Sequence, residues 1–80
     1  MNELLAQAAR KNIPILHDDI NFIRKMTPKI PYNLRKEVYR RYLDIWVREQ
    51  RVCSDRIKAH NAGRFAANQF LLAYDYVERL

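Results

Sequence analysis

The stretch Leu34-Arg-Lys-Glu-Val-Tyr-Arg-Arg-Tyr-Leu-Asp-Ile-Trp-Val47 carries the clearest periodic pattern in the sequence. Its apolar residues recur at intervals of three and four, the repeat of one face of an α-helix. That face comprises Leu34, Val38, Tyr42, Ile45 and Trp46, widened by Tyr39, Leu43 and Val47. The pattern predicts a long helix that runs to about Val52. A continuation to His60 stays open, with Ser54 as the one candidate for a new cap.

Two shorter helices are expected upstream of this segment. The first covers Glu3–Lys11 and ends before Pro14, because the residue before a proline is pushed out of the α region. The second covers His17–Met26 and begins with two aspartates, which suit the start of a helix. The connection Thr27–Asn33 contains two prolines and is predicted to be extended, with Asn33 placed to cap the long helix.

A last helix is expected after Asn61–Gly63, which holds the only glycine of the chain and is typical of a helix end. It covers Arg64–Leu80, and its predicted apolar face comprises Ala66, Phe70, Ala73, Val77 and Leu80, with Phe65, Leu72 and Tyr76 beside them. No segment shows the alternation of a half-buried strand. The sequence therefore predicts an all-α fold, a small bundle of about four helices in one domain over residues 1–80.

Length and composition exclude several classes of protein. With 80 residues, of which 49% are apolar and 30% charged, the chain is too apolar for a disordered tail and too charged for a membrane protein. The start of the chain lacks the basic and apolar regions of an export signal. The single Cys53 has no disulfide partner, and with two solitary histidines it makes no zinc site. We expect a cytoplasmic protein without metal or cofactor.

The excess positive charge lies in the middle of the chain. Residues 24–41 contain seven bases and one acid, Glu37, which equals the whole net charge of +6. The start of a helix favours anions through its free N–H groups and its dipole, and Arg35 and Lys36 lie there. We expect the bases to share an exposed surface that contacts phosphates. The candidate contacts are Arg24, Lys25, Lys29, Arg35, Lys36 and Arg40.

A solvated helix face is the competing interpretation of the same charges. Pairs of opposite charge at a spacing of four residues stabilise an exposed helix by about 0.2–0.5 kcal/mol each. The long helix has three of them, Glu37–Arg41, Arg40–Asp44 and Asp44–Arg48. These pairs leave the bases before Glu37 without a neutralising acid. The proline-containing connection is too long for a DNA-reading helix-turn-helix, so sequence-specific reading of a groove is not expected.

Three groups of residues look like catalytic or metal-binding sets, and each has a simpler structural interpretation. Tyr39 and Tyr42 form a pair similar to the paired tyrosines of replication initiators and relaxases, yet their spacing places both on the buried side of the helix. The run His17–Asp19 is typical of a helix start, because adjacent residues point in different directions. Cys53 has no histidine three or four residues away. We therefore expect that the protein is not an enzyme.

Trp46 lies in a turn of the long helix that is apolar nearly all round. One interpretation places it at the centre of the protein's own core. The other places it at a seam with a second chain, because a short chain has few helices to surround it. In that case Tyr39 and Trp46 are candidate interface anchors, and the partner is a second copy in a homodimer or another protein.

The residues Leu34, Val38, Tyr39 and Tyr42 precede the run Gly63-Arg-Phe-Ala-Ala-Asn-Gln-Phe-Leu-Leu72. Together they resemble a segment of phage replication initiator proteins of the gene A type, over about half of the chain. The resemblance implies a small protein of a phage, plasmid or integrated element that keeps a DNA-associated helical segment without the catalytic domain. It also implies that Arg64 and Asn68, one turn apart on an exposed side of the last helix, contact phosphates or a partner.

These observations support one leading hypothesis and two alternatives. The leading hypothesis is a non-enzymatic accessory protein of a mobile element that binds nucleic acid, DNA rather than RNA, through phosphates and largely without sequence readout. The first alternative is a protein-binding inhibitor or adaptor, of the kind that phages use against host defence or replication, whose basic surface meets an acidic partner. The second is half of a toxin–antitoxin pair or a homodimeric regulator. No membrane partner is expected.

Overall fold

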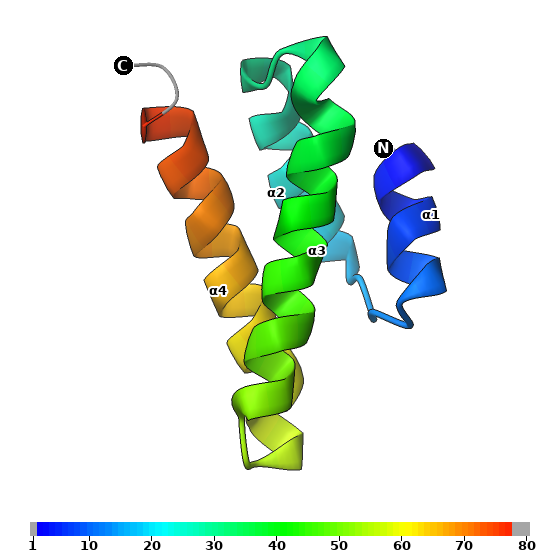
Figure 1. The fold of residues 1–80 in the computed structure, drawn as a ribbon, viewed down its shortest axis with the longest axis vertical. Helices are drawn as coiled ribbons and strands as arrows, with labels where there is room; N and C mark the ends of the chain where they lie inside the picture. Colours follow the sequence, from blue (N-terminus) through cyan, green and yellow to red (C-terminus); the bar gives the residue numbers. More distant parts are fainter. Residues whose placement is uncertain (1, 78–80) are drawn as a thin grey trace.

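The computed structural model describes residues 2–77 and shows four α-helices (Figure 1). They are α1 (Asn2–Arg10), α2 (His17–Met26), α3 (Arg35–Val52) and α4 (Arg56–Val77). Two short 3₁₀ turns, η1 (Thr27–Lys29) and η2 (Tyr32–Leu34), lie between α2 and α3. The described residues contain no strand. The predicted all-α fold, a small bundle with a long central helix, is confirmed.

The long helix α3 lies at the centre of the molecule (Figure 1). α4 runs back along one side of α3 as its antiparallel partner, and these two helices share the largest interface. α1 packs on the other side of α3, while α2 lies behind α3 and also contacts α4. The buried face of α3 therefore forms the centre of the core.

The buried face of α3 agrees closely with the predicted one. Its buried side chains are Val38, Tyr39, Tyr42, Leu43 and Trp46, with Ile45 and Val47 half-buried. Leu34 differs from the prediction, because it belongs to η2 and is exposed. The tighter winding of a 3₁₀ turn shifts the register of the residues before α3, so Leu34 leaves the apolar stripe.

The chain reverses direction between α3 and α4 over Cys53–Asp55. Asp55, rather than the predicted Ser54, caps the new helix, because its carbonyl oxygen and its Oδ1 accept the backbone N–H of Lys58 at 3.1 and 3.4 Å. The half-buried Cys53 thiol donates to the same carbonyl at 3.6 Å. The long helix ends at Val52, so the continuation to His60 that the sequence left open is wrong.

Gly63 lies inside α4 and does not end a helix, which corrects the prediction from the sequence. Its φ is not positive, so a left-handed backbone does not explain the glycine. A Cβ at this position would lie 2.6 Å from Cδ1 of Trp46 and 2.7 Å from the Trp46 carbonyl oxygen. Glycine is therefore required because α4 approaches α3 closely at this point.

The buried side of α4 is also turned relative to the predicted side. Three residues at a spacing of four are buried, Gly63, Ala67 and Leu71. The predicted face is half-buried at Ala66 and Phe70 and exposed at Ala73. The side chains of its other members, Val77 and Leu80, lie outside the described part of the structure. The prediction began the helix after Gly63 and so left this residue out of its face, whereas the close approach of α4 to Trp46 at Gly63 turns the row of Gly63, Ala67 and Leu71 toward the core.

The bounds of α1 and α2 agree with the prediction to within one residue. Asn12 follows α1 with a φ of 56°, a left-handed conformation that asparagine tolerates. The connection between α2 and α3 is not extended as predicted, because it forms η1 and η2 around the buried Ile30. Asn33 lies within η2, and α3 begins without the expected side-chain cap from this residue.

Candidate functional site

Five basic residues reach one end of the molecule, around the connection between α2 and α3. This end lies at the top of Figure 1. The residues are Arg24 and Lys25 in the last turn of α2, Lys29 in η1, and Arg35 and Lys36 at the start of α3. All five lie in the segment from Ile20 to Lys36, which contains no aspartate or glutamate. We call these five residues the basic end.

The side chains of the basic end differ in how firmly they are positioned. Arg24, Lys25, Lys29 and Lys36 are exposed. Arg35 is half-buried, and its Nε donates to the Ile30 carbonyl at 3.1 Å, which orients the guanidinium. The same guanidinium lies 5.5 Å from the centre of the Tyr32 ring. The basic end thus combines one oriented guanidinium with four exposed basic side chains, which suits contact with several phosphates.

A groove of about 650 Å³ borders the basic end. It is lined by Glu3, Thr27, Tyr32, Asn33, Arg35, Lys36 and Tyr39. Two hydroxyls in this lining, those of Thr27 and Tyr39, lie 3.3 Å apart, and Thr27 also donates to the Ile23 carbonyl at 2.7 Å. The lining carries two cations and the single carboxylate of Glu3. The lining of the groove therefore carries a net positive charge and offers hydroxyl and amide groups to a ligand.

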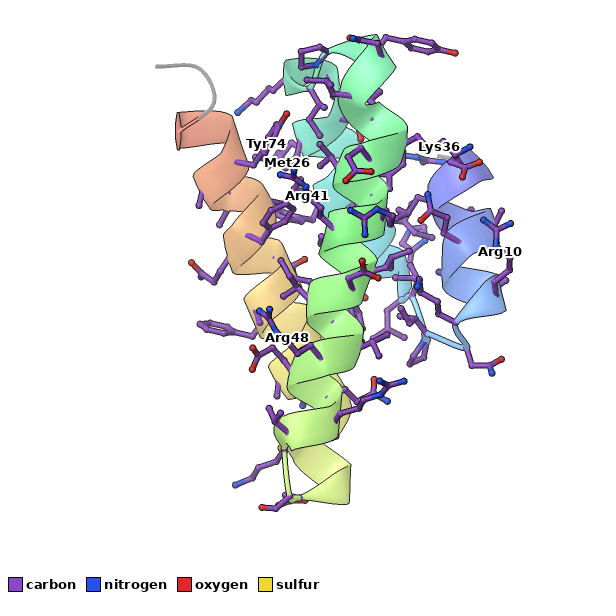
Figure 2. The ribbon with its side chains drawn as sticks, in the orientation of Figure 1. Arg10, Met26, Lys36, Arg41, Arg48 and Tyr74 are labelled. Carbon is purple, nitrogen blue, oxygen red and sulfur yellow. The ribbon has the colours of Figure 1, made fainter. Side chains whose placement is uncertain are left out.

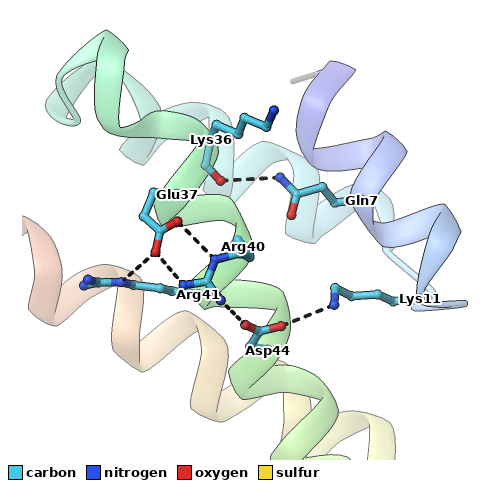
Figure 3. Close-up of polar contacts among 7 residues, drawn as sticks. All are labelled: Gln7, Lys11, Lys36, Glu37, Arg40, Arg41 and Asp44. Carbon is cyan, nitrogen blue, oxygen red and sulfur yellow. Dashed lines mark hydrogen bonds and ion pairs between the residues drawn. The ribbon is translucent and has the colours of Figure 1, made fainter.

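Arg40 and Arg41 do not extend the basic end, because acids of α3 neutralise them (Figure 3). Arg40 donates to Glu37 and, from Nη1 to Oδ2 at 2.6 Å, to Asp44. Arg41 Nε lies 3.5 Å from Glu37, and Lys11 of α1 lies 3.3 Å from Asp44. The hydrogen bond from Arg40 lowers the pKa of Glu37 below its ordinary value. Arg40 thus lies in an exposed ion-pair network, and its contact with phosphate stays a prediction.

The seven bases between residues 24 and 41 do not share one face, which corrects the expectation from the sequence. Lys36 points toward α1, whereas Arg41 points toward α4 (Figure 2). Each residue of an α-helix is turned by about 100° from the one before, so residues five apart face different sides. Arg48, which the sequence pairs with Asp44, lies 3.6 Å from Glu49. Of the phosphate contacts predicted between residues 24 and 41, all but Arg40 belong to the basic end.

Arg64 and Asn68 lie on the inner side of α4, not on the exposed side that the resemblance implies. Arg64 Nε lies 3.0 Å from both carboxylate oxygens of Asp19, a residue that is 3% exposed. The Arg64 guanidinium also lies 5.1 Å from the Trp46 ring. Asn68 Oδ1 accepts the Tyr42 hydroxyl at 2.6 Å. Both residues join α4 to the other helices, and their expected contact with phosphates is corrected accordingly.

Trp46 and Tyr39 belong to the protein's own core. Their exposed fractions are 0% and 4%, and α4 covers Trp46 at Gly63. A side chain buried in this way does not reach a partner, so the expectation that they are interface anchors is corrected. Tyr42, the second member of the tyrosine pair, is buried too, and burial together with the nearby Asp19 raises the pKa of its hydroxyl.

Tyr32 is the candidate functional residue that the sequence analysis missed. Its side chain is 85% exposed, more than any other large apolar or aromatic side chain in the described residues. Periodicity does not detect it, because it lies in the connection and not in a helix. The signal in the sequence is an aromatic residue directly after Pro31, inside the segment from Ile20 to Lys36 that contains bases and no acid.

The run His17–Asp19 begins α2, as interpreted from the sequence. Asp19 Oδ2 accepts the backbone N–H of Leu16 at 3.0 Å, so it caps the helix from its third position. Among the side chains that the structure describes, no three histidines, cysteines, aspartates or glutamates are grouped so that they could hold a metal ion. No helix in the described part of the chain is both long and apolar enough to cross a membrane.

Comparison of the chain with protein-family models, with curated proteins and with solved structures finds no match. The candidate site is therefore defined by geometry: the basic end, the groove beside it and the exposed ring of Tyr32.

Proposed function

We propose that the protein is a non-enzymatic accessory protein that binds nucleic acid through phosphates at the basic end. The observation that carries the proposal is the placement of five bases on the last turn of α2, the connection and the start of α3, in a segment from Ile20 to Lys36 that contains no acid. Each cation that meets a phosphate releases condensed counterions, so several together give affinity that does not depend on sequence. Bases spread over a helix end, a connection and a helix start suit a phosphate backbone better than base edges.

The proposed setting is a phage, plasmid or other mobile element, and the proposed ligand is DNA rather than RNA. Support for this setting comes from the sequence resemblance to gene A-type initiators. Because Arg64 and Asn68 have structural roles, the resemblance contributes no contact residues to the proposal.

Fluorescence anisotropy with a labelled oligonucleotide, measured as duplex and as single strand, tests the proposed function. If four to five phosphates are contacted, the logarithm of the duplex affinity should fall with the logarithm of salt concentration with a slope of roughly −4. An affinity that stays flat between low and moderate salt contradicts the proposal.

Two double variants separate the basic end from the total charge. Lys25→Gln/Lys36→Gln removes two charges at the basic end, and Arg48→Gln/Arg51→Gln removes two charges further along α3. We expect the first variant to reduce the salt slope by about 2 and to weaken binding at low salt by roughly tenfold or more. The second should leave the slope unchanged. Equal losses of affinity in the two double variants would show that only the net charge of the protein attracts nucleic acid.

A protein-binding adaptor or inhibitor is the second candidate function, and the outer side of α4 favours it. Phe65 and Leu72 are exposed and lie seven residues apart, so they share one side of the helix. Such a pair suits an apolar contact, while the basic end meets an acidic part of the partner. A pull-down from nuclease-treated host lysate tests this function. Capture of one stoichiometric protein by the unmodified chain, and its absence with the variant Phe65→Ser, supports it. Loss of all partners after nuclease treatment supports nucleic-acid binding.

A further inference from the structure

Tyr32 presents an aromatic ring to solvent in the middle of the basic end. From this ring and its neighbours we infer that the basic end takes single-stranded nucleic acid in preference to duplex, with an unpaired base stacked on Tyr32. The inference rests on the proposed function and names the form of nucleic acid that the same site binds.

The backbone holds Tyr32 in a defined place. Ile30 is buried and attaches the connection to the core, and Pro31 restricts its own φ to −53°. The turn is closed by two hydrogen bonds, from the Leu34 N–H to the Pro31 carbonyl at 2.9 Å and from the Arg35 N–H to the Tyr32 carbonyl. Because a tyrosine side chain has only two rotatable angles, stacking on it costs little conformational entropy.

Core packing does not explain an aromatic residue at this position. The ring is 85% exposed, so it removes little apolar area from water. Its contact is with the Arg35 guanidinium, 5.5 Å from the ring centre, and a cation over an exposed ring contributes little to stability. Tyr32 therefore has surface to offer to a ligand at small cost to the fold.

The surroundings of Tyr32 provide what one nucleotide needs. The ring offers a face on which any base can stack, and Arg35 and Lys36 offer positive charge to the adjacent phosphates. The groove beside the ring, about 650 Å³, lies within the usual size of ligand sites, and Asn33 adds an amide to its lining. An acidic peptide would use the cations but leave the ring without a role. A single strand uses both.

A duplex provides the phosphates but not the base. Its bases lie inside the stack, and taking one out costs free energy, so the Tyr32 ring gains no partner from an intact duplex. The cations of the basic end contact the phosphates of either form. Tyr32 is thus the residue that distinguishes a single strand from a duplex.

Anisotropy titrations of the full chain test the inference with three labelled probes of about 15 nucleotides: oligo-dT, oligo-rU and a linear duplex. Tyr32→Ala should weaken binding of both single strands by roughly tenfold, and the duplex by less than about twofold. Tyr32→Phe should bind like the unmodified protein, because the ring remains. Val52→Ala removes another exposed apolar side chain, at the end of α3, and serves as the control without effect.

Each alternative outcome is distinguishable. If Tyr32→Ala binds single strands as tightly as the unmodified protein, the stacking inference is overturned. The proposed function still holds in that case, provided that binding of nucleic acid depends on salt. Equal losses on single strand and duplex also overturn the stacking inference. If the unmodified protein binds none of the probes at low salt, the inference and the proposed function both fail.

Discussion

The Nε atom of Arg64 lies 3.0 Å from both carboxylate oxygens of Asp19, which joins α4 to α2 across 45 residues of sequence. Asp19 also accepts the N–H of Leu16 at the start of α2, and Arg64 lies over the ring of Trp46. Since a buried carboxylate is unfavourable without a cation, this pair links the positions of three helices.

Removal of the Arg64 charge is therefore expected to destabilise the folded protein. Arg64→Met should lower the free energy of unfolding by about 3 kcal/mol, because Asp19 stays buried without its cation. Urea unfolding followed by circular dichroism measures this loss. The double variant Asp19→Asn/Arg64→Met should recover part of it. Arg41→Met, at an exposed ion pair, is the control and should change stability little, so equal losses would contradict the expectation.

The hydrogen bond between Tyr42 and Asn68 should contribute measurably to stability. Tyr42→Phe removes the donor and leaves Asn68 Oδ1 without its partner at 2.6 Å. We expect the free energy of unfolding to fall by about 1–2 kcal/mol in urea titrations. Tyr32→Phe removes the same atom from an exposed ring and should have no effect. Similar losses for the two variants would rule out a specific role for the buried hydroxyl.

The Tyr42 hydroxyl should also make stability depend on pH in the alkaline range. Burial and the nearby Asp19 raise the pKa of Tyr42 above its ordinary value of 10.0 in the folded state. The unfolded chain therefore loses this proton first, and the free energy of unfolding falls as pH rises above about 10. Urea titrations at about pH 9 and about pH 11 should show a smaller fall for Tyr42→Phe than for the unmodified protein. Parallel pH profiles would contradict this assignment.

A methyl group at Gly63 should push α4 away from α3. Gly63→Ala is expected to lower the free energy of unfolding by about 2 kcal/mol or more, although alanine favours a helix by about 1 kcal/mol. The added Cβ would lie 2.7 Å from the Trp46 carbonyl oxygen, a backbone atom that cannot rotate away as the end of a flexible side chain can. Thermal unfolding and the emission of Trp46 report the change. Gain of stability from Gly63→Ala would show that the helices are not in close contact there.

Neutralising Glu37 should strengthen nucleic-acid binding if the proposed function holds. Glu37→Gln releases Arg40 and Arg41 from their carboxylate partner, next to the basic end. We expect affinity at low salt to rise by about threefold and the salt slope to steepen by about 1. Glu49→Gln removes the same charge beside Arg48 and is the matched control. An equal rise in both variants would trace the effect to net charge.

Local patterns predicted the helices well because their signals lie within a few residues. The stripe Val38 to Trp46 follows the 3.6-residue repeat, and Pro14 and the aspartates near His17 mark helix bounds that the structure keeps. The α4 prediction failed because it assumed that Gly63 ends a helix. A glycine that ends a helix and a glycine that lets two helices pack closely look the same in the sequence. Only the position of Trp46 in the structure shows that Gly63 is of the second kind.

The amino-acid sequence by itself determined that the protein is helical and that its bases crowd into one segment, since both properties depend on composition and spacing alone. Only the tertiary structure decided which cations face solvent. Arg64 turns inward to Asp19, and Tyr32 stands in solvent. These outcomes depend on which residues from distant parts of the chain meet when the helices pack, and local spacing along the chain does not reveal that.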